Sequence, residues 1–202
     1  MTRTPLTAER ILEAAECVLR RHGPDKANVV DVARELGVSH GSVYRHFPSK
    51  AALRDAVTER WLAEISAPLA RVAAAEGPAP ERLRQWLDQL VRSKHSRARE
   101  DPELFATYSR LAAEARAVIE AHVTALTDQL ARIIAEGIAR DELDVTDPQT
   151  AARALFDATS RFHNPANAAA WSDRAINDAY EAVRSLVLSG LTRCTAAPNR
   201  QS

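Results

Sequence analysis

The segment from Val29 to Leu53 constrains the fold more than any other part of the chain; it reads VVDVARELGVSHGSVYRHFPSKAAL. Val32 and Leu36 lie on one apolar face at helical spacing, so a short helix must pack that face against another element. Gly37 can end this helix in a left-handed conformation, and Ser39 can cap the next helix through its hydroxyl. Two helices joined by so short a turn must cross steeply, which predicts a helix-turn-helix.

The second helix of this motif, expected over residues 40–47, is short and polar. Val43 and Phe47 are four residues apart and can pin it to its neighbours. The positions left exposed carry small, polar or cationic side chains: His40, Gly41, Ser42, Tyr44, Arg45 and His46. Because a helix-turn-helix places its second helix in the major groove, these residues are candidates for DNA contact.

A family resemblance rests on the run from Val29 to Leu53, above all on Tyr44, Phe47, Pro48 and Lys50 after the turn with Ala33 and Gly37. In this pattern the chain resembles the amino-terminal domain of the tetracycline-repressor (TetR) family of transcriptional regulators. The resemblance implies an all-α fold, with a three-helix helix-turn-helix DNA-binding domain over residues 1–50. A linking helix and a helical ligand-binding and dimerisation domain would follow over residues 51–194.

The resemblance also implies that Tyr44 and Lys50 contact phosphates. Such contacts fix register on the duplex without carrying sequence information. Base choice would then fall to Ser42 and His46, with His40 or Arg45, because only the exposed face of the second helix reaches base edges. The alternative for Tyr44 is a half-buried aromatic that seals the three-helix core, and for Lys50 a solvated surface lysine.

Composition excludes several classes of protein. The chain has 202 residues, is 46% hydrophobic and carries a formal net charge of +0, which argues against a general polycation that wraps nucleic acid. Cys17 and Cys194 lie at opposite ends, so neither a disulfide framework nor a metal-ligand pair is expected. No segment approaches the roughly 18 apolar residues of a membrane span. We therefore expect a cytoplasmic protein that does not enter a membrane.

Helical periodicity continues through the rest of the chain. Thr7 should cap a first helix that Gly23 and Pro24 end, and Ser49 should start a fourth helix that Pro68 kinks or ends. The helices expected beyond it cover residues 81–99, 102–114, 117–140, 148–163 and 173–191. The tail over residues 195–202 is expected to be disordered.

The last two of these helices carry apolar stripes wide enough to bury more than one partner. Their members are Ala151, Ala154, Leu155, Ala158, Phe162, Ile176, Tyr180, Val183, Val187 and Leu191. By the resemblance, these helices form a four-helix bundle with the same pair of a second subunit. Twofold symmetry would then set two DNA-reading helices about 34 Å apart and require a palindromic operator. The alternative is that both stripes close the core of one chain.

By the resemblance, the helices between these two regions enclose a pocket for a small-molecule effector. The candidate lining residues are Trp86, Leu90, Phe105, Tyr108, Leu111, His122, Leu126, Phe156 and His163. Such a lining suits an apolar or aromatic ligand held by one or two hydrogen bonds. The alternative for each of them is an ordinary core residue.

Two of these candidates allow a different effector. His122 and His163, together with Glu103 or Glu114, could bind a divalent metal or an acidic ligand. The alternative is a hydrogen-bonded core histidine or, for His163, a cap on a helix end.

The expected function is a dimeric, sequence-specific regulator, a repressor by family analogy, which an effector releases from DNA by shifting the helices at 102–114 and 50–67. It requires no cofactor. An all-helical enzyme is disfavoured, because the chain has no Glu-x-x-His pair and no phosphate-binding glycine loop. The other alternative is an adaptor that uses the helix-turn-helix to bind protein, which a steep salt dependence of DNA binding would exclude.

Overall fold

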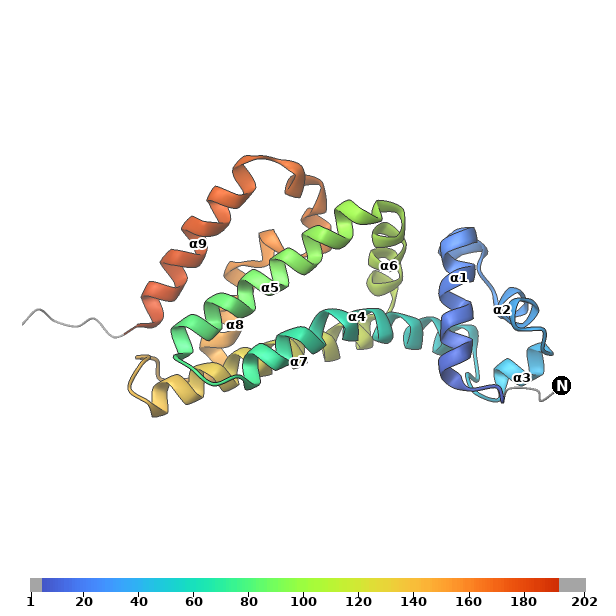
Figure 1. Cartoon of the computed structure of the whole chain (residues 1–202), viewed down its shortest axis with the longest axis horizontal. Helices are drawn as coiled ribbons and strands as arrows, with labels where there is room; N and C mark the ends of the chain where they lie inside the picture. The colour runs from blue at the N-terminus through green and yellow to red at the C-terminus, as the bar shows by residue number, and fades with distance from the viewer. Residues whose placement is uncertain (1–4, 193–202) are drawn as a thin grey trace, which may run out of the picture. The chain divides into compact units, whose positions relative to one another are not determined.

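The computed structural model describes residues 5–192, and the regular elements within this range are helices, with one isolated bridge between Leu143 and Thr192 (Figure 1). The elements are α1 (Ala8–Lys26), α2 (Val29–Leu36), α3 (His40–Tyr44), α4 (Lys50–Ala74), α5 (Ala79–Glu100), α6 (Pro102–Glu114), α7 (Arg116–Ala139), α8 (Pro148–Ala158), the 3₁₀ helices η1 (Ser160–Phe162) and η2 (Pro165–Ser172), and α9 (Ala175–Leu191). The predicted all-α class is confirmed. Within residues 5–192 no helix is long and apolar enough to cross a membrane. The predicted tail lies outside the described residues.

The chain divides into two compact units. The N-terminal unit comprises Met1–Glu64 and Arg97–His122, and the C-terminal unit comprises Ile65–Ser96 and Val123–Ser202. Helix α6 therefore belongs to the same unit as the helix-turn-helix, although it follows α5 in the sequence.

Local capping signals set the helix starts. The Thr7 hydroxyl accepts a hydrogen bond from the Arg10 amide at 3.3 Å, and the Asp101 carboxylate accepts one from the Leu104 amide at 3.0 Å. The predicted break at Gly23 is present as a residue with φ 72° inside α1, after which the helix makes one further turn. Short polar side chains at these positions satisfy amides that the first turn of a helix leaves unpaired.

Pro68 was expected to kink or to end α4, and the structure contradicts the second alternative. The helix continues to Ala74 with Pro68 inside it. Ile65 and Leu69, on either side of the proline, are fully buried. Their burial stabilises the helix by about 1.5–3 kcal/mol per side chain, which offsets the cost of about 3 kcal/mol for an internal proline.

The segment after Pro148 corrects another expectation. A single helix was expected over residues 148–163, but α8 ends at Ala158 and the chain continues as η1 and η2. The hydroxyl of Thr159 is buried and donates to the Leu155 carbonyl at 2.9 Å. Such a side-chain bond competes with the helical ladder, and the tighter turn that follows buries Phe162. Helix α3 is also shorter than the expected 40–47, while the other helix ends agree within two residues.

The core of the C-terminal unit is tight where α7 passes the start of α5. A methyl group added at Gly137 would lie 2.6 Å from the Cβ of Ala79 and 2.7 Å from Cδ1 of Leu143. Real Cβ atoms do not approach so closely, so this position requires glycine. A methyl group added at Gly190 in α9 would meet no atom within 4 Å.

We therefore expect Gly137→Ala to lower the free energy of unfolding by about 1–3 kcal/mol through overpacking. Gly190→Ala is the matched control and should cause no loss, because alanine favours a helix by up to about 1 kcal/mol over glycine. Urea denaturation followed by circular dichroism measures both variants. Equal midpoints for the two variants would contradict this account of the packing.

Candidate DNA interface and effector region

The turn between α2 and α3 has the geometry that the sequence predicts. Gly37 adopts φ 65° and ψ 32°, the left-handed conformation in which glycine avoids a steric penalty. The Val38 amide donates to the Ala33 carbonyl at 3.0 Å, and the Ser42 amide donates to the Ser39 hydroxyl at 3.3 Å. These bonds satisfy backbone groups in the last turn of α2 and in the first turn of α3, and the turn between them sets the direction of α3.

Helix α3 is held by one residue and exposes the others. Val43 is completely buried, and Phe47, just beyond the helix, is half-buried. The side chains of His40, Arg45, His46 and Lys50 are exposed, as is the backbone at Gly41, while Ser42 is half-buried. Tyr44 is 43% exposed, and its ring lies edge-on to His40 with ring centroids 6.4 Å apart. The residues expected to contact DNA therefore reach solvent from one short helix and the start of α4.

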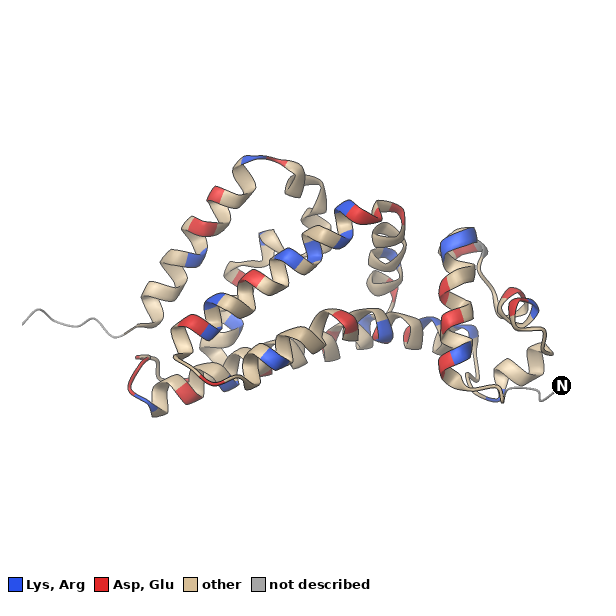
Figure 2. Ribbon diagram, in the orientation of Figure 1, with Lys and Arg blue, Asp and Glu red and all other residues tan. Residues whose placement is uncertain are grey.

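The charged side chains next to α3 are the exposed cations Arg45 and Lys50, whereas the carboxylates of α2 form ion pairs with arginines. Figure 2 shows no acidic residue on α3. In α2, Asp31 accepts a hydrogen bond from Arg34 at 2.8 Å and Glu35 accepts one from Arg21 at 3.0 Å. Arg45 and Lys50 therefore place positive charge beside α3 in a chain that has no net charge.

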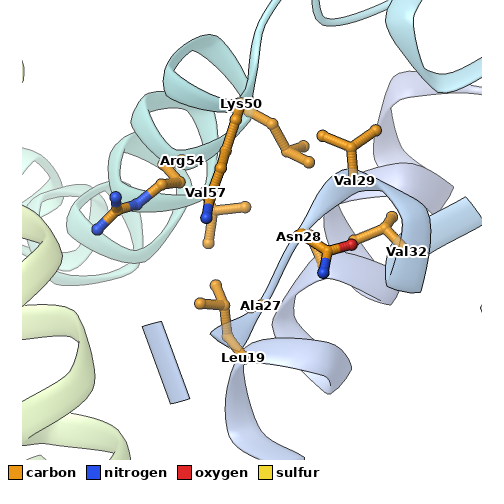
Figure 3. A pocket seen from close by; sticks show the side chains of 10 residues that line it. Leu19, Ala27, Asn28, Val29, Val32, Lys50, Arg54 and Val57 are labelled. Carbon is orange, nitrogen blue, oxygen red and sulfur yellow. The ribbon is translucent and has the colours of Figure 1, made fainter. Parts of the chain in front are cut away.

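A small hollow lies between α1, α2 and the start of α4 (Figure 3). Its lining is mostly apolar and consists of Ala15, Leu19, Ala27, Asn28, Val29, Val32, Lys50, Leu53, Arg54 and Val57. Leu53 and Val57 anchor α4 here, and the side chain of Lys50 crosses the edge of the hollow. The packing that positions Lys50 is therefore the packing that joins α4 to the helix-turn-helix.

Helix α6 is attached to the DNA-binding helices at both of its ends. Asp101, which caps α6, pairs with Arg20 of α1, and Arg110 pairs with Asp25 of α1 at 2.5 Å. At the other end, Glu114 accepts a hydrogen bond from Arg54 of α4 at 2.6 Å. These residues are far apart in the sequence, so sequence patterns gave no sign that they pair.

An aromatic stack joins the middle of α6 to α4. The ring of Trp61 stacks on Tyr108 with centroids 4.9 Å apart, and it lies edge-on to Phe105 at 6.1 Å. Burial raises the pKa of Tyr108 far above its usual value, so the phenol is neutral. Phe105, Tyr108 and Leu111, which were expected to line an effector pocket, are buried in the N-terminal unit, and His122 is half-buried there.

The other expected pocket residues lie in the C-terminal unit. Trp86, Leu90 and Leu126 are buried, and the indole of Trp86 donates to the Gln129 side chain at 2.9 Å. The ring of Phe156 lies 4.5 Å from that of His163, measured between centroids.

His163 is a neutral, hydrogen-bonded side chain. Its Nε2 lies 3.2 Å from the Phe156 carbonyl and 3.3 Å from the Thr159 hydroxyl. The pKa of His163 is lowered to about 4, mainly by burial; the hydrogen bond to the Phe156 carbonyl acts in the opposite direction, and the positive charge of Lys94 adds to the lowering. Because Nε2 must donate to that carbonyl, Nδ1 is the nitrogen that can accept.

Two buried polar residues were not expected from the sequence. On α5, Lys94 is 6% exposed and His95 is 7% exposed. The Nε2 atom of His95 lies 2.9 Å from the Phe162 carbonyl, and its ring stacks on Trp171 with centroids 4.6 Å apart. Their spacing could have indicated burial, because each follows a buried residue, Leu90 or Val91, by four positions on the same face of α5.

Metal binding gains no support from side-chain clustering. Among residues 5–192, His, Cys, Asp and Glu form no group of three or more that could hold a metal ion.

The residues expected at a dimer interface fall into two sets. Leu155, Phe162, Ile176 and Tyr180 are buried within the single chain, and the Tyr180 hydroxyl donates to Asp88 at 2.8 Å. The exposed or half-buried set comprises Ala151, Ala154, Ala158, Val183, Val187 and Leu191. Leu186 of the same α9 stripe is 74% exposed. The surface of α8 and α9 thus keeps small and apolar residues in contact with solvent.

Comparison with known proteins identifies both halves of the chain. Residues 11–57 match the tetR family of bacterial regulatory proteins, and residues 79–184 match the C-terminal domain of tetracyclin repressor-like proteins. The HTH-type transcriptional regulator Rv1255c of Mycobacterium tuberculosis is 32% identical over 108 residues, which are 53% of this chain and 51% of that protein. The chain therefore spans about half the length of this relative.

Solved structures share the fold over nearly the whole chain. SmeT, the repressor of the Stenotrophomonas maltophilia multidrug efflux pump SmeDEF, superposes with a TM-score of 0.67 at 20% identity and covers 98% of this chain and 96% of its own. RolR in complex with resorcinol superposes with a TM-score of 0.61 at 18% identity and covers 91% of this chain and 86% of its own. Together with the matched regions and the helix-turn-helix geometry, these findings show that the chain belongs to the tetR family of DNA-binding transcriptional regulators.

Proposed function

We propose that the chain acts as a homodimer that binds a palindromic operator and represses transcription until a small, largely apolar or aromatic effector releases it. The observation that carries this proposal is the exposed surface of α3, which has no acidic residue and is held in place by the Gly37 turn and buried Val43. The proposed role is that of a cytoplasmic regulator and not of an enzyme.

On this proposal the residues around α3 divide into two roles. Tyr44 and Lys50 contact phosphates, because a phenol and an ammonium suit phosphate oxygens and both are exposed. His40, Gly41, Ser42, Arg45 and His46 belong to the part of the motif that enters the major groove, where base edges are read.

The proposed dimer interface uses the part of α8 and α9 that the single chain leaves uncovered. Ala154 and Ala158 are exposed on α8, and small side chains allow close approach of helices. Leu186 is largely exposed on α9, where a second copy would bury it. A twofold interface of this kind pairs the same patch on both subunits and gives two α3 helices in symmetric positions.

The proposed effector is apolar or aromatic because the expected pocket residues are mostly aliphatic or aromatic. RolR was solved in complex with an aromatic ligand, resorcinol, which agrees with this class. We favour it over a metal or an acidic ligand at His122 and His163, because the Nε2 of His163 is already engaged by the Phe156 carbonyl.

We propose that α6 transmits the effector's influence to the DNA-binding helices. Its ion pairs with α1 and α4 make it part of the N-terminal unit, so a shift of α6 acts directly on the helices that support α3. An effector that binds two arrangements of α6 with different affinity would shift the population away from the DNA-binding state.

Removing the Lys50 ammonium tests the DNA-binding role. We expect Lys50→Ala to weaken binding to all DNA sequences alike and to reduce the slope of log K against log salt concentration by about one per subunit. Arg153→Ala is the control, because Arg153 is exposed on α8, outside the DNA-binding motif, and should leave the slope unchanged. Fluorescence anisotropy with labelled duplex at several salt concentrations measures the slopes. DNA binding that does not depend on salt in the unmodified chain would favour a protein-binding adaptor.

Exchanging the charges of an α1–α6 ion pair tests the attachment of α6. We expect Asp25→Arg and Arg110→Glu each to reduce operator affinity about twofold to fivefold, the scale of an exposed ion pair, and the double exchange to restore it. The same exchange of the exposed pair Glu81 and Arg84 within α5 is the control and should leave operator affinity unchanged. If the double exchange combined the two losses instead of restoring affinity, this pair would not couple α6 to DNA binding.

A further inference from the structure

A chain of side-chain hydrogen bonds runs along α3 and ends at Arg45. The Oγ atoms of Ser39 and Ser42 lie 2.9 Å apart, and Nη2 of Arg45 donates to Oγ of Ser42 at 3.1 Å. The Ser42 amide also donates to Oγ of Ser39. The Ser42 hydroxyl therefore accepts from Arg45 and shares a second hydrogen bond with the Ser39 hydroxyl, in which either oxygen can donate.

This arrangement directs the guanidinium of Arg45 toward the first turn of α3. Arg45 is the residue at the C-terminal end of the helix and is exposed, so its side chain would otherwise be free to point elsewhere. In a helix-turn-helix, the N-terminal residues of the second helix meet the base edges. The hydrogen bond to Ser42 thus holds a cation beside the part of α3 that approaches bases.

Arg45 and Ser42 differ in the hydrogen-bonding groups that they can still offer to DNA. A guanidinium has five N–H donors, and the contact with Ser42 uses one of them. The remaining donors can form the bidentate pair with O6 and N7 of guanine that is the commonest specific contact of arginine. The Ser42 hydroxyl, in contrast, already has two hydrogen-bond partners within the protein, Ser39 and Arg45.

We propose that Arg45 reads a guanine in each half of the operator and that Ser42 is a positioning residue that holds the Arg45 side chain in the reading conformation. This inference rests on the proposed function, since it requires sequence-specific DNA binding. Holding a long side chain in its bound conformation lowers the ordering cost of the contact, which gives Ser42 an effect on base preference without contact to a base.

The test is selection of bound duplexes from a random DNA pool at physiological salt, with the full chain and four variants of it. Arg45→Lys keeps the charge and removes the planar fork, so the preference for guanine at one position of each half-site should fall by about 5-fold to 150-fold. Ser42→Ala should reduce the same preference at the same position by about 3-fold to 10-fold. Ser42→Thr keeps the hydroxyl and should retain the preference, while His46→Ala should leave this position unchanged.

The outcomes separate the inference from the proposed function. If the unmodified chain enriches no sequence, the proposed function fails and the inference falls with it. If it enriches a palindrome whose base preferences survive Arg45→Lys, Arg45 contacts a phosphate and only the inference is overturned. A Ser42→Ala effect at a different position, or the same loss for Ser42→Thr as for Ser42→Ala, would also overturn the positioning role. If Arg45→Lys and Ser42→Ala lower the preference for the same guanine, and Ser42→Thr retains that preference, the inference is supported.

Discussion

The orientation of α3 depends on the left-handed turn at Gly37. A residue with a side chain would adopt this conformation at a cost of about 1–2 kcal/mol, and any relaxation would rotate α3 away from its seat. Val43 is the buried residue that α3 presents to the core, so the turn and this single anchor together set which side chains face outward. Leu53 and Val57 line the same hollow as Lys50, so the packing of α4 against α1 and α2 places Lys50, one of the two phosphate-binding candidates.

Ion pairs join the helices of the N-terminal unit. The carboxylates of α2 pair with arginines, and Asp101 and Glu114 at the two ends of α6 pair with α1 and α4. Each exposed pair contributes at most about 1 kcal/mol. Their joint effect is to keep α6 beside the helices that carry α3, which is the physical basis for coupling an effector to DNA binding.

Sequence reasoning predicted the features that depend on neighbouring residues. The caps at Thr7 and Ser39 and the turn at Gly37 follow from short-range hydrogen bonding and backbone sterics, and the structure has each of them. Local rules left open whether α4 ends at Pro68 or continues, because burial of Ile65 and Leu69 by distant parts of the chain decides the outcome against the local cost of proline.

Side chains that meet across long sequence separations were also beyond prediction. The membership of α6 in the N-terminal unit rests on pairs such as Asp25 with Arg110, which no periodicity reveals. Lys94 and His95 could have been expected inside from their spacing on α5, but a lysine in that register is ordinarily solvated. The apolar stripe of α9 was visible in the sequence, yet only the structure divides it into buried Tyr180 and exposed Leu186.

The central claim is that two copies of the chain bring two α3 helices to symmetric positions on one duplex. Hydroxyl-radical footprinting of the chain on the DNA that it selects tests this claim most directly. The account predicts two protected stretches related by twofold symmetry, with centres about 34 Å apart along the helix axis. A single asymmetric stretch, or protection without regular spacing, would contradict it.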